Sequence, residues 1–158
     1  MGNPRALDKI DRKILHEIQL NNQLTSVQLS EKAGLSPTSA QRRLNRLRAD
    51  KIIESDIAVV SNAAVGRPLT LIISVQLERE RSDIIDHFKK SVRNEAIVMS
   101  AFYVTGDTDF ILIIAAKDMA EYEEFTRHFL YDNPDIKGFK TTVVMDRIKA
   151  SFYVPPWD

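Results

Sequence analysis

Two stretches of this sequence hold side chains whose types and spacing could do chemistry. Residues 36–51 carry five basic residues against one acidic residue, and residues 104–110 read VTGDTDF. Arginine can pair with guanine or phosphate, and asparagine with adenine, so the first stretch is typical of a surface that binds DNA. The second places two carboxylates beside a glycine, which is typical of a tight turn and also of a loop that holds a small ligand. Both interpretations depend on the elements that position these residues.

Side chains that often catalyse reactions are not grouped in a recognisable way. His16, His87 and His128 fall on three different predicted helices without a partner at ligand spacing, and the chain has no cysteine. Asp107 and Asp109 could bind a divalent cation, but two carboxylates alone indicate such a site only weakly. We therefore expect no enzyme activity, no catalytic residue, no metal and no cofactor.

Composition places the chain among ordinary globular proteins. It has 158 residues, 44% of them hydrophobic and 28% charged, enough for one domain or two small ones. No run approaches the roughly 18 apolar residues of a membrane span, and the N-terminus lacks the apolar core of a signal peptide. We expect a cytoplasmic protein with no membrane partner. The formal net charge is zero, so the positive charge of residues 36–51 is local.

The first third of the chain predicts three short helices. Apolar residues recur at helical spacing from Leu7 to Ile18, and Asp8 is a plausible N-cap. A second helix opens with Thr25 three residues before Gln28, the spacing of a capping box, and a glycine follows it. The third begins with Ser-Pro at residues 36–37, an N-cap followed by proline at the first helical position. A short helix, a turn and an arginine-rich helix predict a helix-turn-helix domain.

A helical wheel separates the two faces of the third helix. Leu44 and Leu47 lie on the apolar side, and the opposite side has donors and cations but no carboxylate. The candidate DNA-binding residues are Ser36, Thr38, Ser39, Arg42, Arg43, Asn45 and Arg46. We expect Arg43, Arg48 and Lys51, on the flanks, to contact phosphates. A solvated three-helix bundle is the alternative, and the agreement of caps, turn, apolar face and charge favours DNA.

Beyond residue 52 the pattern changes. Apolar alternation over residues 53–59 predicts a short strand, and SNAAVGRP reads as a linker. The predicted division is a DNA-binding domain with that strand at residues 1–61, a linker at residues 62–68 and a second domain at residues 69–158.

The second domain has the predicted order βαββαβ. Strands at residues 69–77, about 97–104 and about 109–116 and a last one in FKTTVVMDRIK alternate with two amphipathic helices. This is the ferredoxin-like arrangement, in which both helices cover one face of a four-stranded antiparallel sheet. The whole chain is thus predicted to be α+β. Both phases of FILIIAA, residues 110–116, are apolar, so we expect a second copy to cover the free face in a homodimer.

Three segments resemble the Lrp/AsnC (leucine-responsive regulator) family. LDKIDRKILHEIQLNNQLTSVQLSEKAGLSPTSAQRRLNRL resembles its winged-type helix-turn-helix, VTGDTDFILII its Gly-Asp-aromatic-Asp-Tyr segment, and TTVVMDRIK its last strand. The resemblance implies a prokaryotic transcription regulator that binds double-stranded operator DNA. It also implies dimers that assemble into tetramers or octamers, and an amino acid or related small effector bound to a RAM/ACT-like second domain.

Carried over residue by residue, the resemblance assigns a set of effector-binding candidates. They are Tyr103, Thr105, Gly106, Asp107, Thr108, Asp109, Phe110 and Thr141. Thr108 stands where the family commonly has an aromatic residue, and Phe110 where it commonly has tyrosine, so the ligand's identity is open. An ACT-like amino-acid sensor that does not bind DNA is the alternative function. The final YVPPWD is unlike the typical tail, and Trp157 either packs on an interface or belongs to a frayed end.

Overall fold

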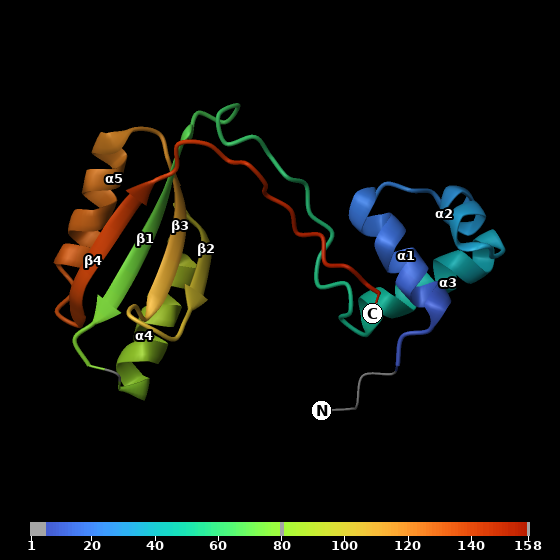
Figure 1. Cartoon of the computed structure of the whole chain (residues 1–158), viewed down its shortest axis with the longest axis horizontal. Coiled ribbons are helices and arrows are strands. Elements are labelled where there is room, and N and C mark those ends of the chain that lie inside the picture. Colours follow the sequence, from blue (N-terminus) through green and yellow to red (C-terminus); the bar gives the residue numbers. More distant parts are fainter. Residues whose placement is uncertain (1–5, 80, 158) are drawn as a thin grey trace. The chain divides into compact units, whose positions relative to one another are not determined.

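The chain forms two compact units in a computed structural model that describes residues 6–79 and 81–157 (Figure 1). Of the described residues, the helical unit contains those up to Ala58 together with those from Lys149 onward. The sheet unit is Val59–Ile148. The polypeptide therefore passes from one unit to the other at two places in the sequence.

Three helices build the helical unit: α1 (Lys9–Leu20), α2 (Ser26–Ala33) and α3 (Pro37–Ala49). The expected caps are confirmed. Asp8 and Asp11 form a capping box on α1, and Thr25 and Gln28 form one on α2. The residue after α2 is Gly34, whose φ of 72° lies in the left-handed region that favours glycine. The turn between α2 and α3 thereby has the sharp geometry of a helix-turn-helix.

Apolar residues from all three helices form the core of this unit. Ile14, Leu29, Ala40 and Leu47 are fully buried, and Leu15, Ile18, Ala33 and Leu44 surround them. The predicted apolar faces of α1 and α3 are confirmed, since each turns inward.

The prediction of a short strand within residues 53–59 is wrong. Residues 54–60 form neither helix nor strand, and their side chains are exposed. A strand needs a hydrogen-bonding neighbour, and no described residue pairs with this segment in a ladder. Instead Arg48 binds Asp56 through Nε at 2.9 Å and Nη2 at 3.2 Å, which holds the segment near the end of α3.

The sheet unit has the expected βαββαβ order. Its elements are β1 (Leu69–Leu77), α4 (Ser82–Asn94), β2 (Val98–Tyr103), β3 (Phe110–Ala116), α5 (Met119–Phe125) and β4 (Ile136–Val143), with a π-helical segment, Thr126–Tyr131, continuing α5. The strand order is β2-β3-β1-β4, and every neighbouring pair is antiparallel, as in the predicted ferredoxin-like sheet (Figure 1). Strands β2 and β4 are therefore the two edges.

One face of the sheet carries the core. Alternate residues of the central strands, including Ile73 and Leu112, pack with Phe88 of α4 and Leu130 of the segment after α5. Ile72, Ile111 and Ile113 have the opposite phase and are only half-buried. These three isoleucines lie outside the core that the helices close.

Residues 149–157 form no helix or strand and group with the helical unit. This differs from the expected second domain of residues 69–158, because the end of the chain contacts α1. Trp157 lies near His16, with ring centroids 5.2 Å apart. No helix formed by residues 6–79 and 81–157 is long and apolar enough to span a bilayer.

Candidate functional site

The solvent-facing side of α3 carries several of the predicted DNA-binding residues together. Thr38, Arg42 and Asn45 are exposed, and Ser39 is half-buried beside them. Oδ1 of Asn45 accepts a hydrogen bond of 2.9 Å from Gln41. All of these groups can form hydrogen bonds, and none is negatively charged, so this surface can approach the edges of base pairs.

Two other arginines of α3 turn toward α1 instead. Arg43 donates to Asp8 at 2.6 Å and to Asp11 at 2.8 Å, and Arg46 donates to Asp11 at 2.6 Å. The side chain of Asp11 is only 4% exposed, whereas that of Asp8 is 52% exposed. The hydrogen bond that Arg43 donates to Asp8 lowers the pKa of Asp8 and raises the pKa of Arg43. These ion pairs connect α3 to the first turn of α1.

Arg42 has a different environment from the other arginines of α3. Arg43, Arg46 and Arg48 each bind a carboxylate. Within the described part of the chain, Arg42 has no hydrogen-bond or ion-pair partner. It is therefore the arginine of α3 whose guanidinium group is available for another molecule.

The importance of Asp11 was not predicted from the sequence. The available signal was the pair of aspartates at the start of α1, three residues apart, in a bundle that also contains an arginine-rich helix. A helical wheel of α3 alone could not reveal these ion pairs, because they form between α1 and α3.

The segment between β2 and β3 is a turn fastened to β1. Gly106 has a φ of 122°, which residues with a side chain rarely adopt. The hydroxyl of Thr108 donates to the carbonyl of Val75 at 2.7 Å. The carboxylate of Asp109 accepts from the backbone N–H of Leu77 at 2.7 Å. Thr108 and Asp109 thus have structural partners within the unit.

Asp107 and Thr105 occupy the outer part of this turn. Both are exposed, and Asp107 forms no hydrogen bond or ion pair with a residue that the structure describes. The two carboxylates that look equivalent in the sequence therefore differ, because Asp109 is engaged and Asp107 is available.

Aromatic residues support the turn, while one predicted neighbour lies elsewhere. The rings of Tyr103 and Phe110 are 5.0 Å apart, and Nζ of Lys89 lies 4.6 Å from the centre of the Tyr103 ring. Thr141 belongs to β4, at the opposite edge of the sheet from β2, and hydrogen-bonds to the hydroxyl of Tyr122 at 2.8 Å. Within one chain the structure brings Tyr103 and the turn together, but not Thr141.

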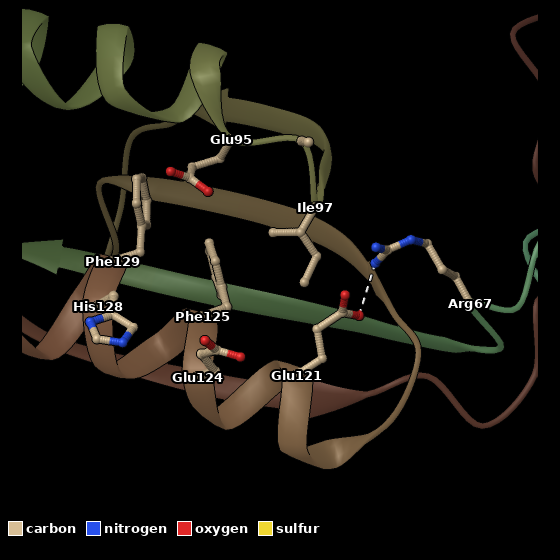
Figure 2. Close-up of a pocket in the computed structure, with 9 residues that line it drawn as sticks. Arg67, Glu95, Ile97, Glu121, Glu124, Phe125, His128 and Phe129 are labelled. Atoms are coloured by element: carbon tan, nitrogen blue, oxygen red, sulfur yellow. Dashed lines mark hydrogen bonds and ion pairs between the residues drawn. The ribbon is translucent and has the colours of Figure 1, made fainter.

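A separate groove lies between the segment after α4 and the helix that begins with α5. Figure 2 shows Phe125 and Ile97 pointing toward each other across it. The groove has a volume of about 360 Å³. Arg67 donates to Glu121 at 2.8 Å and to the carbonyl of Ala115 at 3.0 Å. None of the predicted effector-binding residues lines this groove.

The groove and the turn belong to opposite ends of β3. Arg67 donates to the carbonyl of Ala115 near the end of β3, whereas the turn leads into Phe110 at the start of that strand. The pKa of Glu121 is lowered by the backbone N–H of Lys117 and, to a smaller extent, by Arg67. No spacing in the sequence indicated this groove, because its residues come from three distant segments.

The histidines do not form a cluster. His16 bonds to Tyr153, His128 lies 3.5 Å from Asp132, and His87 is exposed on α4. No three histidine, aspartate or glutamate side chains among the described residues are placed to hold a metal ion.

Family comparisons assign both units. The family model for the Lrp/AsnC ligand-binding domain matches residues 70–154, and a winged helix-turn-helix DNA-binding model matches residues 7–54. The second match disfavours the alternative of a sensor without a DNA-binding domain.

Individual relatives agree with these matches. A helix-turn-helix-type transcriptional regulator of Sinorhizobium fredii is 62% identical over 149 residues, which cover 94% of this chain and 88% of the relative. The leucine-responsive regulatory protein of Escherichia coli is 30% identical over 147 residues, covering 93% of this chain and 90% of that protein.

A similar fold is known from a crystal structure. A transcriptional regulator of Neisseria meningitidis, solved in complex with L-methionine, superposes with a TM-score of 0.89 at 34% identity, covering 95% of this chain and 97% of that one. The matched families, the relatives and the shared fold agree with the resemblance seen in the sequence. The chain therefore belongs to the Lrp/AsnC family of transcriptional regulators, with a helix-turn-helix DNA-binding domain followed by the family's ligand-binding domain.

Proposed function

We propose that this protein is a cytoplasmic, homodimeric regulator that places α3 in the major groove of operator DNA. Binding of an amino acid or related small metabolite beside the turn at residues 104–110 changes its DNA affinity or its assembly. Such an effector acts through a difference in its affinity for the two states of the protein. Dimers assemble further into tetramers or octamers.

The observation that carries the DNA-binding proposal is the contrast among the arginines of α3. Arg42 is exposed and unpaired within the described chain, whereas Arg43 and Arg46 bind Asp11. We assign base contacts to Arg42 and Asn45, because guanidinium and amide groups can form bidentate pairs with guanine and adenine. Arg43 and Arg46 orient the helix and present their outer N–H groups toward phosphates.

The polar N-terminal residues of α3 complete this surface. Thr38 is exposed there, and the hydroxyl of Ser36 donates to Ser39 at 3.0 Å. These hydroxyls and the backbone N–H of Thr38 suit phosphate oxygens, whereas Pro37 has no N–H and that of Ser39 donates to Ser36. They therefore fix the register of the helix on the duplex.

The proposed dimer follows from the uncovered face of the sheet. Ile72, Ile111 and Ile113 form an apolar row on that face. A second copy would cover this row and remove its apolar surface from water. A two-fold dimer also presents two copies of α3 to half-sites about one helical turn apart.

The proposed effector site uses the available groups of the turn. Asp107 can pair with the ammonium group of an amino acid, and Thr105 can donate to its carboxylate. The relative from Neisseria meningitidis binds L-methionine, which supports an amino acid as the class of ligand. Asp109 and Thr108 hold the turn in shape by their bonds to β1.

Binding to selected operator fragments tests the assignment of Arg42. Genomic fragments enriched by the wild-type protein are titrated in gel-shift assays with Arg42→Ala and with Arg93→Ala, a matched exposed arginine on α4. Loss of a base contact should weaken specific binding by about 1–3 kcal/mol in the first variant and leave the second unchanged. Equal affinities for wild type and Arg42→Ala would exclude Arg42 from base recognition.

A thermal-shift screen tests the ligand. The common L-amino acids are added singly, and a compound that binds the folded state raises the melting temperature. Asp107→Ala should abolish that increase, while Glu123→Ala, an exposed acidic control on α5, should preserve it. If Asp107→Ala responds like the wild type, the turn is not the effector site.

A further inference from the structure

The C-terminal segment of residues 149–157, here called the strap, is bound along one side of α1. The side-chain amide of Gln19 forms two hydrogen bonds with the backbone of Val154, one as acceptor and one as donor. The N–H of Val154 donates to Oε1 at 2.7 Å, and Nε2 donates to the carbonyl of Val154 at 3.0 Å. Nη1 of Arg12 donates to the carbonyl of Pro156 at 2.6 Å. These contacts span more than 130 residues of sequence, so they are tertiary contacts.

Aromatic contacts add to the hydrogen bonds. Nδ1 of His16 lies 2.9 Å from the hydroxyl of Tyr153, and their rings meet edge to face. The ring of Trp157 also contacts His16, with ring centroids 5.2 Å apart. His16 therefore contacts two aromatic residues of the strap.

The composition of the strap suits an extended bound segment. Pro155 and Pro156 have no backbone N–H that would need a partner, and their fixed φ lowers the conformational entropy lost on ordering. Arg12, His16 and Gln19 are spaced at four and three residues, so they form one stripe along α1. This stripe is the docking surface of the strap.

Helix α1 contacts the strap and α3 through adjacent residues. Arg12 binds the strap, while Asp11, the preceding residue, accepts hydrogen bonds from Arg43 and Arg46 of α3. The ion pairs of Asp11 are shielded from water, because its side chain is 4% exposed. A displacement of α1 by the strap would therefore act directly on the helix proposed to read DNA.

The other end of the strap continues from the ligand-binding domain. Thr108 and Asp109 bind β1 at Val75 and Leu77. On its other edge, β1 pairs with β4. The chain leaves β4 at Val143 and becomes part of the helical unit at Lys149. The anchor points pair with the beginning of β4, at Phe139 and Ile136, and the chain leaves β4 at its other end, so β4 itself runs from the turn's anchor points to the segment that leads into the strap.

We propose that the strap is a second connection through which the ligand-binding domain acts on α3, with the stripe of Arg12, His16 and Gln19 as its binding surface. Its regulatory consequence rests on the function proposed above. Its physical basis, a bound strap that restrains α1 and α3, holds with or without an effector.

Hydrogen exchange and fluorescence test the physical basis in the full-length protein. Trp157 is the only tryptophan, so its emission reports on the strap alone. Gln19→Ala should make Trp157 more accessible to acrylamide and should make the amides of α1 and α3 exchange several-fold faster. A chain that ends at Lys149 should show the same faster exchange. Lys13→Ala, an exposed control on α1, should change neither signal.

Two results would overturn the proposal at this stage. One is a wild-type Trp157 that is quenched as easily as in the urea-unfolded protein, which would mean that the strap is not bound. The other is unchanged exchange in α3 when the strap is removed, which would mean that it does not restrain that helix.

DNA titrations with the common L-amino acids as probes test the regulatory consequence. In the wild type, an effective amino acid changes the apparent operator affinity, and in the chain ending at Lys149 that change should shrink several-fold. An undiminished change would overturn the proposal. A wild type that shows no operator binding or no response would instead contradict the proposed function, and the exchange of α3 would still decide whether the strap restrains it.

Discussion

Asp11 at the start of α1 accepts a hydrogen bond of 2.6 Å from Arg46 of α3, and the same carboxylate oxygen accepts one from Arg43. One almost fully buried carboxylate thus joins two guanidinium groups that are themselves partly exposed. The arrangement fixes the rotation of α3 about its axis and leaves Arg42 and Asn45 on the exposed side.

Replacing Asp11 should destabilise the protein. Asp11→Asn keeps the size of the side chain but removes the charge shared by Arg43 and Arg46, at an expected cost of about 1–3 kcal/mol in the free energy of unfolding. Asp8→Asn is the matched control, because the exposed Asp8 carboxylate should contribute less than about 1 kcal/mol. Urea titrations followed by circular dichroism measure both. Equal effects of the two variants would mean that the burial of Asp11 is not important.

Acid should weaken the contribution of Asp8 in a defined direction. Its pKa is lowered in the folded state by the hydrogen bond from Arg43. The stabilisation is therefore complete above the ordinary aspartate pKa of about 3.9 and is lost as the pH falls through the lowered value. The difference in unfolding free energy between the wild type and Asp8→Asn should be constant near neutral pH and shrink below about pH 4. A difference that grows on acidification would contradict the assigned ion pair.

The two aspartates of the turn should respond in opposite ways. Asp109→Ala removes the acceptor of the Leu77 N–H and should cost about 1–3 kcal/mol of stability. Asp107→Ala removes an exposed carboxylate without a described partner, so stability should change by no more than about 0.5 kcal/mol. Chemical denaturation gives both values. If Asp107→Ala were the more destabilising variant, its loss of ligand response could no longer be attributed to the binding site.

Local features of the fold were predictable from the sequence because their causes are local. Thr25 and Gln28 cap α2 through bonds that span three residues, and Gly34 ends it by its own backbone conformation. The βαββαβ order of elements along the chain followed from apolar periodicity in the same way. Residues 53–59 have apolar alternation too, yet no strand forms, because alternation reports which side chains share a face and not whether a pairing partner exists.

The parts of the sites that the sequence did not reveal depend on contacts between distant residues. The wheel placed Arg46 with the DNA-binding residues, but its partner Asp11 lies 35 residues earlier in the chain. Asp109 resembles Asp107 in the sequence, and only the position of Leu77 distinguishes them. The contact between Trp157 and His16 likewise depends on the path of the whole chain.

Disrupting the uncovered face of the sheet should dissociate the proposed dimer. Ile113 points away from the core that α4 and α5 close, so Ile113→Glu should leave the sheet unit folded but place charges in the interface. Sedimentation should show a shift from dimers or larger assemblies to monomers. Met119→Glu, at an exposed apolar position on α5, is the matched control and should assemble like the wild type. Circular dichroism checks that both variants are folded. If the folded Ile113→Glu variant sediments like the wild type, the dimer interface must lie elsewhere, and the half-buried isoleucines of this face do not hold two copies together.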